Sequence, residues 1–273
     1  MALTLRSVAG LTVPEIARAL LSSEEAMERR LTRARRKITE AAIPFRVPPD
    51  ERLPERLADV LRVVYLVYTE GQGSVRGEMC TEAIRLARLL ARLMPDEPEV
   101  LGLLALLVVT DGRRPGRVGE DGALVSLEEQ DRALWDAEAI AEGSAILDRA
   151  LRLRRPGPYV IQAAIASLHM DAPRDWSQIA ALYEALVRLT GSAVVELNRA
   201  IAVAETDGGE AGLALVDRLD LDDYQYFHST RGDLLRRLGR RDEARSEYER
   251  ALELAHTEPE RRFLRRRIAE LGA

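Results

Sequence analysis

The stretch RGDLLRRLGRRDEARSEYERA, residues 231–251, decides the fold class. Leu, Arg, Glu and Ala dominate it, and these residues lose little entropy on entering a helix. Gly239 divides the stretch and is typical of a helix end. Small and bulky residues recur on both sides at helical spacing, which predicts a hairpin of two helices. The residues of this pattern are Gly232, Leu235, Gly239, Ala244, Tyr248 and Ala251.

Weaker copies of this hairpin precede it. Ala211 and Leu215 lie 33 residues before Ala244 and Tyr248, and Tyr183 lies 32 residues before Leu215. The last hairpin resembles the tetratricopeptide repeat, whose hairpins stack because one hairpin cannot bury its own faces. The resemblance implies a superhelical array, which in that family often binds a protein or a peptide on its concave face.

The composition favours helices along the whole chain. Of 273 residues, 47% are hydrophobic and only 4% aromatic, and β-branched runs are short, so we expect an all-α protein. Apolar periodicity predicts helices over residues 57–69, 77–93, 98–110, 127–143, 145–154, 158–172, 176–190, 193–205, 210–219, 223–238, 241–256 and 259–271.

Several classes of site have no support in the sequence. Cys80 is the single cysteine, so neither an intrachain disulfide nor a cysteine metal cluster is expected. There is no apolar run of about 18 residues and no signal-peptide pattern, so we expect a cytoplasmic protein without a membrane partner. No Ser/His/Asp arrangement, glycine-rich phosphate loop or pair of carboxylates stands out. We therefore expect no enzyme, no cofactor and no metal.

The amino-terminal end is basic and carries the start signals of two helices. Residues 1–46 hold nine Arg or Lys and five Asp or Glu, a net +4, which leaves −9 for the rest of a chain of net charge −5. Thr12 followed by Glu15 predicts a capping box, and Ser23 predicts the next helix start. Two short helices of which the second is basic indicate a helix-turn-helix.

The second of these helices is the expected DNA-reading helix. Met27 and Leu31 form an apolar stripe along it. Arg29, Arg33 and Arg36 share a different face, from which they can reach phosphates on both sides of a major groove. A solvated helix of mixed charge has the same spacing. In that alternative the segment caps a protein-interaction scaffold that does not bind DNA.

Motifs in this region resemble region 4 of extracytoplasmic-function sigma factors. The runs LTVPEIARAL, residues 11–20, and RLTRAR, residues 30–35, are similar to that family's L-[ST]-x-x-E-I-A-x-x-L and R-L-x-R-A-R patterns. The resemblance implies that the protein binds the −35 promoter element and the RNA polymerase core. It implies base-side contacts from Glu24, Glu25, Glu28 and Arg29, and phosphate-side contacts from Arg30, Arg33 and Arg36.

The resemblance starts inside region 4. The family's region 2, which reads the −10 element, has no counterpart in the sequence. We therefore expect an amino-terminally truncated sigma factor that does not start transcription by itself.

A proline-rich connector follows the basic end. Four prolines between Ala42 and Pro54 oppose helix formation and predict an extended linker. The expected domains are a partial region 4 helix-turn-helix over residues 1–41, the linker over 42–54 and a helical, tetratricopeptide-like domain over 55–273.

The least regular segment of the body lies between Thr110 and Asp136. It combines Asp-Gly pairs, which are typical of tight turns, with several Asp and Arg residues. Such a cluster forms either a salt-bridge network that holds a loop or a ligand or regulatory interface. The interface candidates are Asp111, Gly112, Arg113, Arg114, Gln130, Asp131, Arg132, Trp135 and Asp136.

Four motifs resemble a subgroup of these sigma factors that has a tetratricopeptide-containing C-terminal extension. They are Tyr65–Gly71, Asp111–Pro115, Gln130–Asp136 and Gly157–Tyr159, in the subgroup's order. The resemblance covers nearly the whole chain and implies that the extension regulates the sigma factor by protein contacts. The alternatives are the scaffold and, from the Asp/Arg segment, a hydrolase or transferase.

Overall fold

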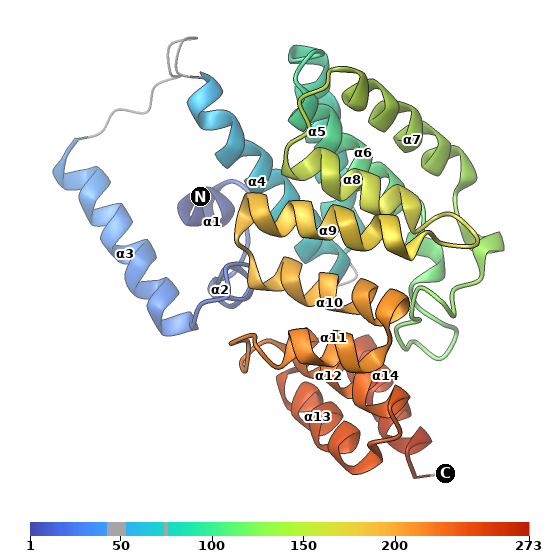
Figure 1. Ribbon diagram of the computed structural model, residues 1–273. Helices are drawn as coiled ribbons and strands as arrows, with labels where there is room; N and C mark the ends of the chain where they lie inside the picture. The colour runs from blue at the N-terminus through green and yellow to red at the C-terminus, as the bar shows by residue number, and fades with distance from the viewer. Residues whose placement is uncertain (43–52, 74–75, 273) are drawn as a thin grey trace. The chain divides into compact units, whose positions relative to one another are not determined.

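The computed structural model describes residues 1–42, 53–73 and 76–272. These residues form helices and short connections, and the isolated bridge between Val118 and Leu124 is their only β-type pairing. The chain divides into two compact units, which we call the head unit, Met1–Met94, and the array unit, Pro95–Ala273 (Figure 1). Residues 43–52 of the expected linker lie outside the described residues, so the expected domain division stays a prediction.

The described part of the head unit contains five helices. As predicted, Thr12 and Glu15 form a capping box at the start of the second one. Ser23 Oγ accepts a hydrogen bond from Ala26 N at 3.2 Å and so caps the third. The helices are α1 (Ala2–Ser7), α2 (Val13–Ala19), α3 (Glu24–Glu40), α4 (Leu53–Gly73) and α5 (Gly77–Leu93).

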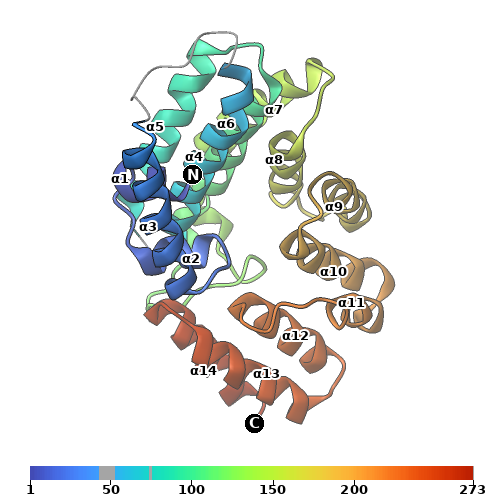
Figure 2. The ribbon, with the colours of Figure 1, turned by 90° about the vertical axis from the view of Figure 1, so that its left-hand side faces the viewer.

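The array unit places consecutive helices side by side. Figure 2 shows α8 to α14 following one another along a curve. The helices are α6 (Pro98–Asp111), α7 (Ala137–Arg152), α8 (Pro158–Leu168), α9 (Trp176–Thr190), α10 (Ala193–Asp207), α11 (Gly209–Val216), α12 (Gln225–Arg237), α13 (Arg241–Leu254) and α14 (Glu258–Glu270), with 3-10 turns at Arg114–Gly116 and Arg132–Leu134.

The hairpin predicted from residues 231–251 is α12 and α13. Gly239 has a φ of +76°, the left-handed conformation that a helix end favours and that glycine adopts without strain. A Cβ at Gly232 would lie 2.9 Å from the ring of Tyr248, so only glycine lets the two helices approach this closely. Tyr248 and Ala244 are buried in the core that the last helices share. The small and bulky residues of the sequence pattern are therefore the ones that pack the two helices against each other.

The predicted helices over 127–143 and 145–154 form a single helix in the structure, so the predicted start at residue 127 and the predicted break after residue 143 are wrong. The structure has turns up to Asp136 and then one continuous helix, α7. Asp136 Oδ1 accepts a hydrogen bond from Ala139 N at 2.9 Å, which starts α7 there. Gly143 does not break the helix, because it is buried against α6, where a Cβ would lie 3.0 Å from Val109 N. Because Gly143 has no side chain, α7 can pack closely against α6.

Glu99 of α6 caps the start of α8. Its carboxylate accepts hydrogen bonds from the backbone N–H groups of Gly157, Tyr159 and Val160, at 3.1, 2.9 and 3.1 Å. Burial raises the pKa of Glu99, although these three donors favour its charged form. One turn further along α6, a Cβ at Gly102 would lie 2.6 Å from Val160 N. The glycine thus lets α8 approach closely enough to be capped by α6.

Candidate nucleic-acid interface and concave pocket

The turn between α2 and α3 is closed by its own backbone. Leu21 has a φ of 47°, in the left-handed region, and Ser22 N donates a hydrogen bond to Ala17 O at 2.9 Å. The Leu21 side chain is 56% exposed, so it occupies no core space. The capping box on α2 and the Ser23 cap on α3 complete a helix-turn-helix.

One face of α3 is buried and the opposite face is exposed to solvent. Met27 and Leu31 are buried, as their spacing predicted. All seven residues predicted to meet DNA lie on α3 and are exposed. They are Glu24, Glu25, Glu28, Arg29, Arg30, Arg33 and Arg36.

Charge changes sign along α3. The acidic residues Glu24, Glu25 and Glu28 occupy its first turns, and the arginines follow. Glu25 pairs with Arg29 at 3.2 Å, and Glu40 with Arg36 at 3.5 Å. Both pairs are exposed, and such pairs hold their side chains weakly. The arginines are therefore available to an external anion.

Two charged pairs connect the helix-turn-helix with the α4–α5 hairpin inside the head unit. Arg18 of α2 is hydrogen-bonded to Glu70 of α4, and Arg76, just before α5, lies 2.5 Å from Glu15 of α2. The sequence did not reveal these pairs. The motif Tyr65–Gly71, which contains Glu70, is the one sequence feature described above that pointed to a role for this residue.

The predicted Asp/Arg interface lies mostly in the loop between α6 and α7, which is held by contacts among its own residues. Asp111 pairs with Arg114 at 3.3 Å, and Asp136 N donates to Gly112 O at 2.8 Å. Burial raises the pKa of Asp111, against the effect of Arg114. Trp135 lies against Gly116. These contacts join the two ends of the loop.

Gln130 and Asp131 make contacts within the same loop, while Arg132 also reaches the segment after α8. Arg132 lies 4.9 Å from the centre of the Trp135 ring and donates to the carbonyl oxygens of Met170 and Asp171 at 2.8 and 2.9 Å. Asp131 caps the 3-10 turn that follows it, and Gln130 donates to Val125 O. The contacts described for the loop are those of a network that holds it, and the regulatory role of its residues stays a prediction.

The loop also reaches the last helix of the array unit. Leu124 N donates to Pro259 O at 3.1 Å, and the guanidinium of Arg262 donates to Asp121 O. Glu129 pairs with Arg267 at 2.9 Å. Residues 121–129 therefore bridge the start and the end of the array unit.

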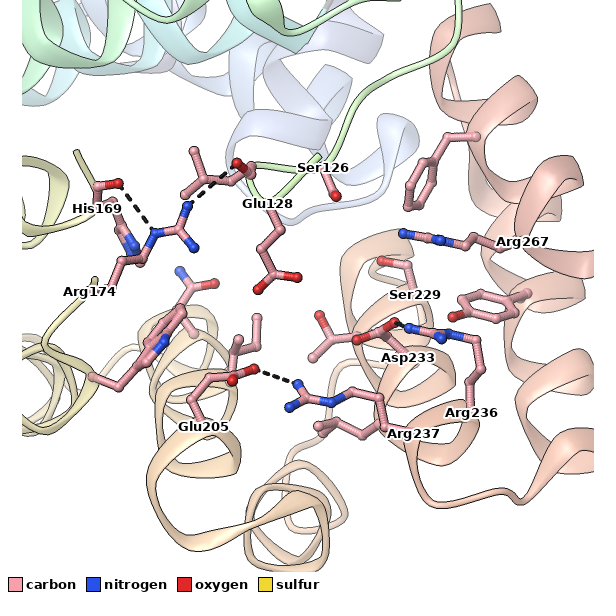
Figure 3. A pocket seen from close by; sticks show the side chains of 18 of the residues that line it. Ser126, Glu128, His169, Arg174, Glu205, Ser229, Asp233, Arg236, Arg237 and Arg267 are labelled. Atoms are coloured by element: carbon pink, nitrogen blue, oxygen red, sulfur yellow. Dashed lines mark hydrogen bonds and ion pairs between the residues drawn. The ribbon is translucent and has the colours of Figure 1, made fainter. Parts of the chain in front are cut away.

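This bridge forms one wall of a pocket on the inner side of the array unit, with a volume of about 580 Å³. Ser126 and Glu128 of the bridge face residues of α10, α12 and α14 in Figure 3. Arg237 pairs with Glu205 and Arg236 with Asp233, each at 2.6 Å. The lining also includes the aromatic side chains Trp176, Tyr183, Tyr248 and Phe263.

Arg174 differs from the other arginines of the pocket. It donates to the carbonyl oxygens of His169 and Leu127 at 3.3 and 3.5 Å, and no carboxylate among the described residues pairs with it. His169 stands beside it, 5.6 Å from Trp176 in an edge contact. Burial and then the positive charges of two neighbouring arginines lower the pKa of His169 to about 4. His169 is therefore uncharged near neutral pH, and Arg174 carries the positive charge at this end of the pocket.

Among the described residues, no helix combines the length and the apolar character needed to cross a membrane. No group of three or more His, Cys, Asp or Glu side chains in the described ranges could hold a metal ion.

Three family models match the chain. Residues 1–38 match "Sigma-70, region 4", residues 56–151 match a "Family of unknown function (DUF6596)" and residues 225–257 match "Tetratricopeptide repeat". The first covers the helix-turn-helix, and the last covers α12 and α13. These two are regulatory or interaction domains without catalytic activity of their own.

One relative aligns with this chain along its whole length. A protein of Rhizobium meliloti (strain 1021), described as uncharacterized, is 49% identical over 285 aligned residues. The alignment spans 100% of this chain and 67% of that protein.

Proposed function

Since this chain belongs to the extracytoplasmic-function-like sigma factors with a C-terminal tetratricopeptide-like extension, we propose that α3 binds the −35 element of promoter DNA and that the extension regulates this binding by protein contacts. The exposed face of α3 carries the proposal. It presents carboxylates toward one end and guanidinium groups toward the other, and the ion pairs that these groups make with other described residues are exposed ones within α3. The protein would bind promoter DNA together with the RNA polymerase core, in the cytoplasm, and would catalyse no reaction.

We assign the two ends of α3 different tasks. Glu24, Glu25, Glu28 and Arg29 would face base edges, where a carboxylate accepts a hydrogen bond from cytosine N4. Arg30, Arg33 and Arg36 would neutralise phosphates and fix the register of the helix on the duplex. A helix-turn-helix commonly places the amino-terminal residues of its second helix deepest in the major groove, which supports this division.

A selection from random DNA duplexes tests the proposal with the full chain. We expect the parent protein to enrich a common motif. Glu28→Gln should change the preferred base at one position by about tenfold, because glutamine favours adenine where a carboxylate favours cytosine. Glu40→Gln, a change on the last turn of the same helix, is the matched control and should leave the motif unchanged.

Two results would count against the proposal. No enriched motif with the parent protein would contradict DNA reading as a whole. An unchanged motif with Glu28→Gln would contradict the base-side position of Glu28 and leave only the phosphate contacts.

We further propose that the pocket of the array unit receives a segment of a partner protein that carries an acidic group. Arg174 supports this, since its guanidinium contacts two carbonyl oxygens and the Trp176 ring, and no carboxylate among the described residues pairs with it. Aromatic walls offer apolar area to the rest of the segment. The interface candidates of the loop, from Asp111 to Asp136, would act by holding the wall of this pocket.

A library of displayed random peptides is the corresponding test. The full chain should enrich peptides that contain Asp or Glu, and Arg174→Gln should reduce their binding about tenfold, as the loss of a charged hydrogen bond implies. Arg218→Gln, at an exposed site of the array unit, is the control. Equal binding by the Arg174→Gln protein would rule out Arg174 as the anion site.

A further inference from the structure

The helix-turn-helix is a small structure that needs support from outside. α1 has six residues and α2 has seven, so each offers about two turns of helix for packing. Ile16 and Ala17 are the buried residues of α2. Helices this short depend on tertiary contacts for their stability and their orientation. The contacts that α2 makes therefore decide how α3 is presented.

The first supporting contact is the pair between Arg18 and Glu70. The Glu70 side chain is 6% exposed, while Arg18 keeps 36% of its side chain accessible. Burial raises the pKa of Glu70, and the guanidinium of Arg18 opposes that effect. A buried carboxylate that loses its cation is left without compensation for its lost hydration. Glu70 therefore holds Arg18, and with it α2, in one position.

The second contact has the opposite polarity. Arg76 donates to one carboxylate oxygen of Glu15 at 2.5 Å, while Thr12 N donates to the other at 2.7 Å. Burial opposes ionisation of Glu15, but the bonds from Thr12 and the nearby guanidinium groups outweigh it and lower its pKa. The same carboxylate thus closes the capping box of α2 and binds the hairpin.

The hairpin end that provides these partners is tightly packed. A Cβ at Gly71 would lie 2.8 Å from Met79 Cβ and 3.0 Å from Cys80 N, so α4 and α5 touch there. Arg76 N donates to Gly71 O at 2.8 Å. Tyr68 is buried one turn before, and its hydroxyl accepts a hydrogen bond from Gln72 at 2.9 Å. Glu70 and Arg76 are therefore presented from a packed support.

Together these contacts form a two-point match. α2 provides an acid and a base three residues apart, Glu15 and Arg18, and the hairpin provides a base and an acid in return. One pair alone would leave α2 free to turn about the contact, and two pairs of opposite polarity fix its direction and register. Charge complementarity of this kind selects one arrangement over others.

We infer that the α4–α5 hairpin is a clamp that orients the helix-turn-helix, with Glu70 and Arg76 as positioning residues for DNA binding by α3. This inference rests on the proposed function. It gives a role to the first two helices of the segment that matches the family of unknown function, residues 56–151. The clamp belongs to the extension in sequence and to the head unit in structure, so a signal that shifts α4 or α5 reaches α3 through two ion pairs.

Two measurements on the full chain test the clamp. The first is the affinity for the duplex enriched by the parent protein. The second is the distance distribution between spin labels at Thr39 of α3 and Thr81 of α5, two exposed positions, in a Cys80→Ala background. Glu70→Gln keeps the shape of the side chain and removes its charge. We expect on the order of tenfold weaker DNA binding and a broader distance distribution.

Controls separate orientation from folding. Glu78→Gln, an exposed change in the first turn of α5, should leave both measurements unchanged. The exchanged pair, Glu70→Arg with Arg18→Glu, should narrow the distribution again and recover most of the DNA affinity. A variant that had merely unfolded the head unit would not be rescued in this way.

The outcomes distinguish the clamp from the proposed function. If Glu70→Gln and Arg76→Gln leave both affinity and distances as in the parent, the clamp is wrong, while DNA reading by α3 stands on its own test. If the parent protein enriches no DNA motif, the proposed function fails. The spin-label distances then still decide whether the hairpin holds α2.

Discussion

Replacing Arg30, Arg33 and Arg36 by alanine is expected to weaken binding of the selected duplex about a hundredfold near 0.15 M salt. Each arginine that neutralises a phosphate releases condensed counterions, and this gives a slope of about −0.9 in log affinity against log salt concentration. Loss of three such contacts lowers the slope by almost three. All three side chains are exposed on α3, and Met27 and Leu31 remain to hold the helix.

The measurement is fluorescence anisotropy of a labelled duplex over a range of salt concentrations. The control removes the same charge from the array unit, at exposed Arg152, Arg188 and Arg218. If the control and the α3 variant lose affinity equally, binding reports net charge alone. An unchanged salt slope in the α3 variant would remove the phosphate contacts from the proposal.

Glu99→Ala is expected to lower the free energy of unfolding by about 3 kcal/mol, because it leaves three backbone donors without their acceptor. The donors are the N–H groups of Gly157, Tyr159 and Val160 at the start of α8. Val160 is fully buried, so water does not easily replace the lost partner there. Loss of this cap also removes a negative charge from the positive end of the α8 dipole.

Urea unfolding followed by circular dichroism measures the total effect, and hydrogen exchange at Val160 measures it locally. Glu138→Ala, an exposed acidic residue in the first turn of α7, should change stability by no more than about 0.5 kcal/mol. A loss below about 1 kcal/mol for Glu99→Ala would mean that α8 is capped by other means.

The sequence predicted those features that depend on local chemistry. Thr12 with Glu15, and Ser23, gave the helix starts because a cap is a contact between near neighbours. The spacing of Met27 and Leu31 was enough to predict the buried face of α3. The hairpin around Gly239 followed from small and bulky residues that pack within one repeat.

The errors and omissions concern contacts between residues far apart in the chain. Gly143 was taken as a helix end, although it is the point where α6 and α7 touch. Glu99 gave no signal, because its donors lie some sixty residues later. Arg18 and Glu70 are 52 residues apart, and no local rule pairs them. For the loop before α7, Asp136 was read as a helical residue, although its side chain starts the helix.

The bridge of residues 121–129 distinguishes the array unit from an open solenoid. Open solenoids gain or lose whole repeats readily, since each repeat contacts only its neighbours. Here Leu124 and Glu129 hold Pro259 and Arg267, so the distance between the first and the last helices is fixed. A hairpin inserted between α8 and α13 would pull the bridge from α14. The bridge therefore closes the array unit into a circuit of contacts, which an open solenoid does not have.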